Sequence, residues 1–478
     1  MTPSYRAIAL VVACALFMEM VDATVLSTAL PSIAADLQVN PVRLSLAITA
    51  YVLSLAVFIP LSGWLADRVG VKRVFVGAIC VFLSGSLACA FSDSLGQLVA
   101  ARALQGLGGA LMTPVARLIL LRAVPRERLV DAMAWMGVPA LVGPLMGPPL
   151  GGFLIEVADW RWIFWINLPI GLLGLLAIWR IVPSVPPGPR RRFDLPGFAA
   201  LALGLLSTMA GLELADGKLL PPLVGLLLLA AGLCLLLVYG LYAWRRTAPA
   251  VDVRLLRHAT FRASLLGGLL FRMGVGALPF LLPLSLQTLH GFDPGTSGLV
   301  TCSAALGAIL MKLIAGRVIG RYGFRQVLSI NALLTALLFA AVGLVTPSGI
   351  GLWALVALLV LGGLSRSLQF TAINTICFAE VAENRMGDAT AFTSVAGQVA
   401  FAVGVALAAL LLSLLSTPGS LPSGTDFEVA FLLFGLAMAL AAPIYYRLER
   451  DAGAHLSPRP AVSRPLDAAT GGGIKTRA

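Results

Sequence analysis

Charged residues are scarce in this sequence. Of its 478 residues only 12% are Asp, Glu, Lys or Arg, 59% are hydrophobic, and the mean hydropathy is +0.94. A soluble globular protein carries about 25% charged and about 45–50% apolar residues. The composition therefore excludes a soluble enzyme, a disordered chain and a fibrous protein. Apolar blocks recur from about Ala7 to about Arg447, so a single anchor helix on a soluble domain is excluded as well.

Residues that bind metals or form disulfides are also few. The six cysteines all lie in apolar segments without a Cys-x-x-Cys pair, and the three histidines are scattered, so neither a disulfide framework nor a metal site is predicted. No GxxxxGK[ST] phosphate loop occurs, which argues against direct drive by ATP. A membrane enzyme would need clustered catalytic motifs and a receptor a substantial extramembrane domain, and neither is present. We expect no enzyme and no cofactor.

The apolar blocks are long enough to cross a membrane. A helix rises 1.5 Å per residue, so about 30 Å of hydrocarbon requires about 20 mostly apolar residues. In lipid every backbone polar group needs an internal partner, so these spans are expected to be helices, and the predicted fold class is an all-α polytopic membrane protein. Cutting at charged or Pro/Gly-rich interruptions gives fourteen spans: 7–29, 44–66, 74–92, 98–121, 132–158, 161–182, 195–215, 222–244, 262–286, 295–318, 326–346, 350–378, 389–416 and 427–447.

The basic residues predict the orientation of these spans. We place the N-terminus in the cytoplasm and count residues within two positions of a span end with the adjoining loop. Of the 34 Lys and Arg residues, 26 then lie in cytoplasmic segments, three in external loops and five within spans. This asymmetry follows the positive-inside rule and places both termini in the cytoplasm. The net charge of +12 is therefore interpreted as a topology signal, and no nucleic-acid partner is expected.

An internal repeat divides the chain. The segment Gly63–Arg73 recurs at Gly316–Arg325 with an offset of 253 residues, which aligns Gly70 with Gly323. Two equivalent loops eight spans apart indicate two six-helix bundles with two inserted spans between them, and duplicated bundles are typical of transporters. The predicted units are an N-terminal bundle (1–182), a basic linker with two inserted spans (183–260), a C-terminal bundle (261–447) and a disordered cytoplasmic tail (448–478).

Several segments resemble the major facilitator superfamily. Gly63–Arg73 is similar to its signature between the second and third spans, Leu98–Ala110 to its fourth-span motif and Gly143–Gly152 to its fifth-span antiporter motif. Asp22–Pro31 and Trp160–Gly171 resemble markers of the fourteen-span drug:proton antiporter branch, and two more segments resemble one multidrug-resistance subgroup: Pro114–Leu118 and Gln369–Thr375. The resemblance covers nearly the whole chain before Arg447.

This resemblance implies a function. It implies a monomeric transporter in the bacterial cytoplasmic (inner) membrane that exchanges protons for drugs or small organic solutes by alternating access. Its partners would be the small-molecule substrate, protons and the lipid bilayer. The alternative is an exporter or facilitator of an anionic metabolite that works without proton coupling.

The loop Gly63–Arg73 is predicted to be a conformational latch. Its glycines permit a tight turn, and Asp67 is suited to the N-terminal end of a neighbouring helix or to an arginine of an adjacent loop. The alternative is a solvated turn that only obeys the positive-inside rule. The residues assigned to the latch are Gly63, Asp67, Arg68, Gly70 and Arg73.

The fifth span carries small residues and prolines. Gly143, Gly147 and Gly151 recur at four-residue steps and let another helix approach closely. Prolines remove backbone hydrogen bonds and bend the span. The resemblance implies that this contact seals one side against proton leak, and ordinary tight packing is the alternative. The remaining motif residues are Pro144, Pro148 and Gly152.

Charged residues inside spans are the main clue to the site, because they are costly in lipid and usually face an aqueous path. Glu19 and Asp22 are three residues apart and share one face of the first span, and Arg102 lies on the fourth. These three residues are predicted to couple transport to protons. A purely structural ion pair of Asp22 is the alternative.

A substrate cavity is predicted from further residues within spans. Arg272 follows Glu19 by 253 residues, the offset of the repeat, so the two are expected at equivalent places in the two bundles. Arginines in the cavity would favour an anionic solute, unless Arg272 only neutralises Glu19 or Asp22. The predicted cavity residues are Arg272, Arg366, Arg117, Phe17, Tyr51, Phe271, Gln369 and Asn374.

Overall fold

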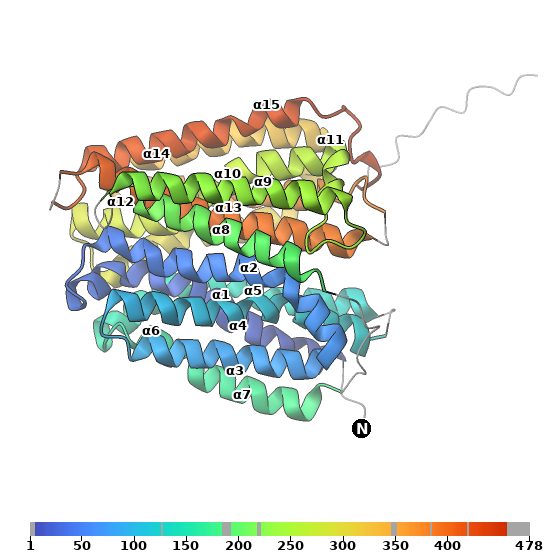
Figure 1. The fold of residues 1–478 in the computed structure, drawn as a ribbon. Coiled ribbons are helices and arrows are strands. Elements are labelled where there is room, and N and C mark those ends of the chain that lie inside the picture. The colour runs from blue at the N-terminus through green and yellow to red at the C-terminus, as the bar shows by residue number, and fades with distance from the viewer. Residues whose placement is uncertain are drawn as a thin grey trace, which may run out of the picture.

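The computed structural model describes residues 5–125, 128–183, 193–217, 221–345, 351–382, 385–417 and 420–456 (Figure 1). Within these ranges every regular element is helical, as predicted. The N-terminal bundle comprises α1 (Tyr5–Asp36), α2 (Ser45–Val69), α3 (Val71–Ala90), α4 (Leu95–Ala123), α5 (Leu129–Val157), α6 (Trp162–Trp165) and α7 (Asn167–Ile181). The inserted pair is α8 (Leu195–Leu214) and α9 (Pro222–Arg245). The C-terminal bundle comprises α10 (Ala259–His290), α11 (Pro294–Val345), α12 (Leu352–Ile376), α13 (Met386–Leu415), α14 (Gly424–Ala439) and α15 (Ala441–Tyr446).

Twelve helical segments of the described chain are long and apolar enough to cross a membrane. This number does not confirm the predicted fourteen. One of the twelve is α11, whose 52 residues include a non-helical position at Gly323 where two helices meet. The helix α5, with 29 residues, is not among the twelve, because only its stretch Leu145–Val157 is counted as apolar helix within the described residues. The first helix is longer than its predicted span of 7–29, because α1 continues to Asp36.

The repeat predicted from the sequence is visible in the backbone. Gly70, between α2 and α3, has φ 100°, and Gly323, 253 residues later, has φ 77°. L-residues with a side chain rarely adopt positive φ, whereas glycine does so readily. Both halves therefore make the same sharp turn at the same place in the repeat.

Helices of the two bundles meet along three seams. Within the bundles α1 packs on α5, α2 and α3 pack on α4, α10 packs on α13, and α11 packs on α12. Between the bundles α5 packs on α11, α2 on α13 and α1 on α10. We name the two ends of the molecule by residues of the N-terminal bundle: the Asp67 end, where α2 ends and α1 begins, and the opposite Thr28 end.

The inserted pair lies against one of these seams. Figure 1 shows α8 beside α2 and α13, and α8 packs on both of them as well as on α9. Four glycines allow the close contact between α8 and α9, since a Cβ at Gly211 would lie 2.4 Å from the Leu229 backbone nitrogen. The predicted linker before α8 lies mostly outside the described residues, as do residues 457–478 of the predicted tail.

Candidate functional site

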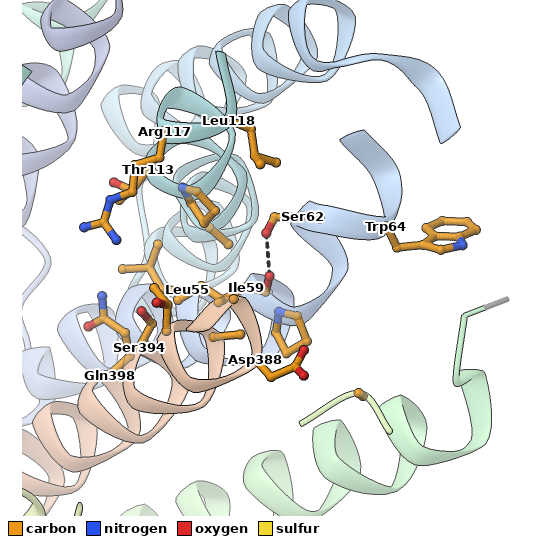
Figure 2. A pocket seen from close by; sticks show the side chains of 18 of the residues that line it. Leu55, Ile59, Ser62, Trp64, Thr113, Arg117, Leu118, Asp388, Ser394 and Gln398 are labelled. Atoms are coloured by element: carbon orange, nitrogen blue, oxygen red, sulfur yellow. Dashed lines mark hydrogen bonds between the residues drawn. The ribbon is translucent and has the colours of Figure 1, made fainter. Parts of the chain in front are cut away.

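A cavity of about 1030 Å³ lies between the bundles and extends to the Asp67 end. Figure 2 shows its wall, with Thr113 and Arg117 from α4, Leu55 and Ile59 from α2, and Gln398 from α13. Eight ionisable residues line it. Glu19 and Arg272 stand about halfway along their helices, and the other six lie nearer the mouth: Asp67, Arg117, Arg122, Asp194, Asp252 and Asp388. A space of this size that reaches one end of the bundle is suited to a solute of drug or metabolite size.

Glu19 on α1 is part of the cavity wall. Its side chain is 3% exposed, and its Oε2 accepts a hydrogen bond of 2.9 Å from the Thr113 hydroxyl. Among the described residues no Lys or Arg forms an ion pair with it. Glu19 is therefore a carboxyl group that reaches the cavity and has no cation bound to it.

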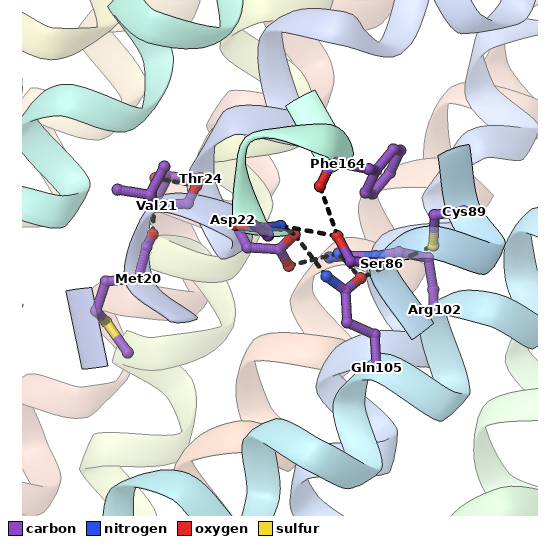
Figure 3. Close-up of polar contacts among 10 residues, drawn as sticks. Met20, Val21, Asp22, Thr24, Ser86, Cys89, Arg102, Gln105 and Phe164 are labelled. Atoms are coloured by element: carbon purple, nitrogen blue, oxygen red, sulfur yellow. Dashed lines mark hydrogen bonds and ion pairs between the residues drawn. The ribbon is translucent and has the colours of Figure 1, made fainter. Parts of the chain in front are cut away.

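Asp22, one turn further along α1, has a different environment (Figure 3). It is fully buried and is not part of the cavity wall. Its carboxylate accepts hydrogen bonds from Arg102 Nη1 at 2.6 Å, from Gln105 Nε2 at 2.7 Å and from Asn167 Nδ2 at 3.0 Å. We call these four residues the Asp22 cluster. Three donors, one of them the Arg102 guanidinium, therefore hold Asp22 as a buried ion-pair partner.

The rest of the Asp22 cluster is held by its neighbours. The Arg102 guanidinium stacks 4.2 Å from the centre of the Tyr51 ring and also donates to Gln105 Oε1. Asn167 donates to the Ser86 hydroxyl. Such a buried pair is costly to break, because removing one partner leaves an uncompensated charge in a dry site. Gln105 and Asn167 were not predicted as site residues, although Gln105 follows Arg102 by three residues and shares its helix face.

The position of the C-terminal bundle that is equivalent to Glu19 carries the opposite charge. Arg272 on α10 lines the cavity, donates to Asn374 Oδ1 at 2.7 Å and lies 5.4 Å from the centre of the Phe370 ring. A Cβ at Gly397 would lie 2.3 Å from Arg272 Nη1, so the glycine makes room for the guanidinium. Among the described residues Arg272 has no acidic partner, and the alternative that it neutralises Glu19 or Asp22 does not match these contacts.

Six of the eight predicted cavity residues do not line the cavity. Arg366 on α12 lies in a small pocket with apolar side chains of α10, α11 and α12, where its Nε donates to the Gly362 carbonyl. Phe17 is half-buried against the hydrophobic core. Three others are buried within their bundles: Tyr51 beneath Arg102, Phe271 against Phe370, and Gln369 against Asn331. Arg117 and Arg272 do line it, and Asn374 lies directly behind Arg272.

The predicted latch lies at the mouth of the cavity. Asp67 forms an ion pair with Arg122 at the end of α4, so its partner belongs to the same bundle and not to the opposite one. Gly63 lies on the cavity wall and Gly70 makes the turn described above. The two basic residues point away from this pair: Arg68 lies over the Trp64 ring, and Arg73 is exposed.

The glycines of the α5 motif allow two helices, α1 and α11, to pack closely against α5. A Cβ would lie 2.5 Å from Met20 at Gly143, 1.9 Å from Thr24 at Gly147 and 2.6 Å from Thr28 at Gly151. The close approach to a neighbouring helix is therefore real, and the neighbour is α1. The far side of the same motif packs on α11 of the other bundle: Gly152 against Gly295, and the Pro148 carbonyl against Gly298. The side chain of Pro144 lies outside the described residues.

The bundles contact each other at the Thr28 end. Gln287 Nε2 of α10 donates to the Thr28 carbonyl at 3.0 Å, and the Gly295 amide donates to Glu156 Oε1 at 2.8 Å. The cavity reaches only the Asp67 end, and the structure is therefore open at that end and closed at the other. In the described part of the chain no group of three or more His, Cys, Asp or Glu residues is placed to hold a metal ion.

Comparison with known proteins gives one consistent family. The sequence matches the Major Facilitator Superfamily over residues 12–248 and 264–476. It is 39% identical over 445 residues to the putative multidrug resistance protein MdtD of Pectobacterium carotovorum subsp. carotovorum (strain PC1), a match that covers 92% of this chain and 95% of the relative. This is the multidrug-resistance subgroup that the segments Pro114–Leu118 and Gln369–Thr375 resemble.

Solved structures give the same fold. A POT family transporter in complex with 5-aminolevulinic acid has a TM-score of 0.70 at 15% identity, covering 92% of this chain and 95% of that one. The human organic anion transporter MFSD10 has a TM-score of 0.63 at 17% identity, covering 93% of this chain and all of that one. At such low identity these likenesses concern the fold alone. From the family match and the MdtD relatives together, the chain belongs to the major facilitator superfamily and is a membrane transporter, not an enzyme.

Proposed function

We propose that the protein is an efflux transporter that exchanges protons for drugs or small organic solutes by alternating access. The observation that carries this proposal is Glu19, a carboxyl group in the wall of the central cavity without an ion-pair partner among the described residues. The naming of its relatives as putative multidrug resistance proteins supports the substrate class.

In this proposal Glu19 binds and releases the coupling proton. The cavity connects it to the Asp67 end, so it exchanges protons with solvent on that side, and the Thr113 hydroxyl is suited to bond either form of the carboxyl. The sequence predicts proton coupling by Asp22 and Arg102 together with Glu19. We now assign Asp22 and Arg102 a positioning role, because their ion pair fixes α1 against α4 one turn from Glu19.

Alternating access would use the seams. The structure is closed at the Thr28 end, where α5 packs on α1 and α11. Closing the Asp67 end would bring α2 towards α13 at the mouth, where Asp67 and Asp388 lie. If Asp67 acts as a latch, it would give up its ion pair with Arg122 and form a contact with the opposite bundle when the mouth closes.

We further propose fourteen spans with both termini in the cytoplasm of a bacterial inner membrane, and a monomer as the working unit. The two helices that meet at Gly323 would count as two spans, and the 29-residue helix α5 would add another. The Asp67 end carries Arg68, Lys72 and Arg73, which supports its assignment to the cytoplasm.

Flux measurements in proteoliposomes test the proposal. A pH gradient imposed across the membrane is expected to drive uptake of a cationic dye against its concentration gradient in wild type. Glu19→Gln should lose this driven flux and keep downhill exchange of substrate for substrate, because the amide holds no exchangeable proton. Glu428→Gln, a carboxyl change on α14 away from the cavity, is the matched control. Driven flux that persists in Glu19→Gln would contradict the assignment.

A second candidate substrate class is favoured by Arg272 and Arg117. Both guanidinium groups line the cavity, and within the described chain neither forms an ion pair. A carboxylate-bearing solute would bind Arg272 through two parallel hydrogen bonds beside the Phe370 ring. Counterflow with Arg272→Gln distinguishes the two classes: loss of organic-anion competition with unchanged dye competition supports the anion, and equal competition in both proteins contradicts it.

A further inference from the structure

The inserted helix α8 is attached to both bundles at the Thr28 end. Near its C-terminal end it carries two carboxyl groups three residues apart, Glu213 in the last turn and Asp216 just beyond it. Asp216 Oδ2 accepts a hydrogen bond of 2.8 Å from the Ser413 hydroxyl of α13. Glu213 lies beside the Thr49 hydroxyl of α2. One end of a single helix thus spans the α2–α13 seam of the closed end.

Glu213 is the unusual member of this group. In the described part of the chain its Oε1 and the neighbouring Thr49 hydroxyl oxygen are buried, and neither forms a hydrogen bond of normal geometry, although the two groups lie close together. The negative charge of Asp216 is close enough to act on it. A buried polar atom without a partner costs about 1–3 kcal/mol, and a charged one costs more. The closed seam is therefore built for the neutral form of this carboxyl group.

We propose that Glu213 is a second proton-binding residue of the transporter and that its proton holds the α2–α13 seam closed at the Thr28 end. This rests on the alternating-access part of the proposed function. The bound proton removes the buried negative charge, and a small rotation of the carboxyl group lets its O–H donate to the Thr49 oxygen. When α2 and α13 separate, water reaches Glu213, hydrates the carboxylate and takes the proton back to the same side. The proton is thus a closing ligand and is not carried across the membrane.

The other charged groups near the seam do not replace this role. On α2, α13 and α9 the acidic and basic residues (Asp67, Arg68, Asp388 and Arg245) lie at the Asp67 end. Arg43, which precedes α2 at the Thr28 end, is exposed and forms no ion pair with a described residue. Lys218 lies outside the described residues. Among the described residues Asp216 is the charge that acts on Glu213, and it opposes ionisation of its neighbour.

Distances across the closed end test the proposal. Spin labels at Asp93 of the N-terminal bundle and Leu421 of the C-terminal bundle, both exposed, report separation at the Thr28 end when the six native cysteines are replaced. The measurement uses full-length protein in lipid nanodiscs. As pH falls, the ratio of short to long distances in wild type should rise. The rise is up to about tenfold per pH unit in the range where Glu213 is ionised in the open state and protonated in the closed state.

Three variants separate the causes. Glu213→Gln imitates the protonated residue, so it should keep the short distance at acidic and alkaline pH. Ser413→Ala removes the tie to α13 and should increase the long-distance population at every pH. Glu428→Gln, a carboxyl change at the same end on α14, should titrate as wild type does. A Glu213→Gln protein whose distances titrate as in wild type would overturn the proposal.

A second measurement distinguishes a proton bound at Glu213 from one bound at the proposed coupling residue, Glu19. The same distances in Glu19→Gln should retain their pH dependence, because Glu213 is intact there. If Glu19→Gln alone abolishes the pH dependence, the closing proton belongs to Glu19 and Glu213 has no such role. Failure of driven flux in wild type would instead contradict the proposed antiport, whatever the distances show.

Discussion

The two bundles share a backbone plan but have unlike polar interiors. In the N-terminal bundle the buried polar group is the ionic Asp22 cluster. In the C-terminal bundle it is neutral: Asn331 donates to Gln369 Oε1 at 2.8 Å and accepts from the Ser365 hydroxyl at 2.9 Å. Amide and hydroxyl groups fix helix positions without a buried charge, whereas the ionic group makes the N-terminal bundle sensitive to any change of charge.

The offset of 253 residues makes the contrast sharper. It aligns Glu19 with Arg272, which both line the cavity, and it aligns Asp22 with Val275, which has no charge. The repeat therefore preserves the turn at Gly70 and Gly323 but not the ionisable groups. This division fits the proposed function, in which the proton site is Glu19 of the N-terminal bundle, and it leaves Arg272 of the C-terminal bundle as a candidate residue for binding an anionic solute.

The largest expected effect comes from breaking the ionic interior. Arg102→Met removes the cation that neutralises Asp22, and the uncompensated buried carboxylate should lower the free energy of unfolding by about 3–5 kcal/mol. Gln369→Met in the C-terminal bundle removes one neutral partner and should cost only about 1–3 kcal/mol. Thermal unfolding in detergent compares the two. Equal losses would show that the ionic character of the Asp22 cluster has no special weight.

A second prediction tests whether close helix contacts are equivalent in the two bundles. A Cβ would lie 1.9 Å from Thr24 at Gly147 on α5 and 2.1 Å from the Met273 carbonyl at Gly404 on α13. Overpacking of this kind typically costs about 1–3 kcal/mol. Gly404→Ala should lower the unfolding temperature more than Gly147→Ala, because the Met273 carbonyl belongs to the backbone whereas the Thr24 hydroxyl is the end of a side chain. Gly77→Ala, where space is open, should lower it least. An equal or larger loss in Gly147→Ala would show that the Thr24 side chain does not move aside.

Much of this arrangement could be predicted from the sequence. The spans follow from hydropathy, the repeat from its glycines, and the contact of α5 from glycines at four-residue steps. What could not be predicted is which side of a helix faces the cavity, because helices here are apolar all round and have no polar stripe. For that reason Tyr51, Phe271 and Gln369 were placed in the cavity although they are buried in their bundles.

The partners in ion pairs and long-range hydrogen bonds could not be predicted from the sequence either. Asp67 had several candidate arginines, and only the packing of α2 on α4 selects Arg122. The role of the inserted pair depends on a contact between Asp216 and Ser413, which are 197 residues apart. A local pattern carries no information about such distant partners.

The third prediction concerns the mouth of the N-terminal bundle. Asp67→Asn removes the ion pair with Arg122, whereas the equivalent position of the repeat is already Gly320. If the pair takes part in switching between states, the maximal rate should fall more than the substrate affinity, because a latch acts on the equilibrium between states. Gly320→Asn in the other bundle is the control and should leave both near wild type. An unchanged maximal rate in Asp67→Asn would favour the solvated turn.

The smallest effect is expected at the corresponding mouth of the C-terminal bundle, where Asp252 forms ion pairs with Arg254 and Arg385. Burial alone would raise the pKa of Asp252, but hydrogen bonds from Arg254 and the charges of both arginines outweigh it and lower the pKa below its ordinary value. A lowered pKa in the folded state adds stability above the unfolded value of about 3.9, and this stability is lost as pH falls through the folded value. Asp252→Asn should therefore destabilise the protein at neutral pH, and its difference from wild type should shrink in acid. The test is to measure the unfolding temperatures of wild type and Asp252→Asn from neutral pH into acid. If their difference stays constant with pH, Asp252 contributes by packing and not by charge.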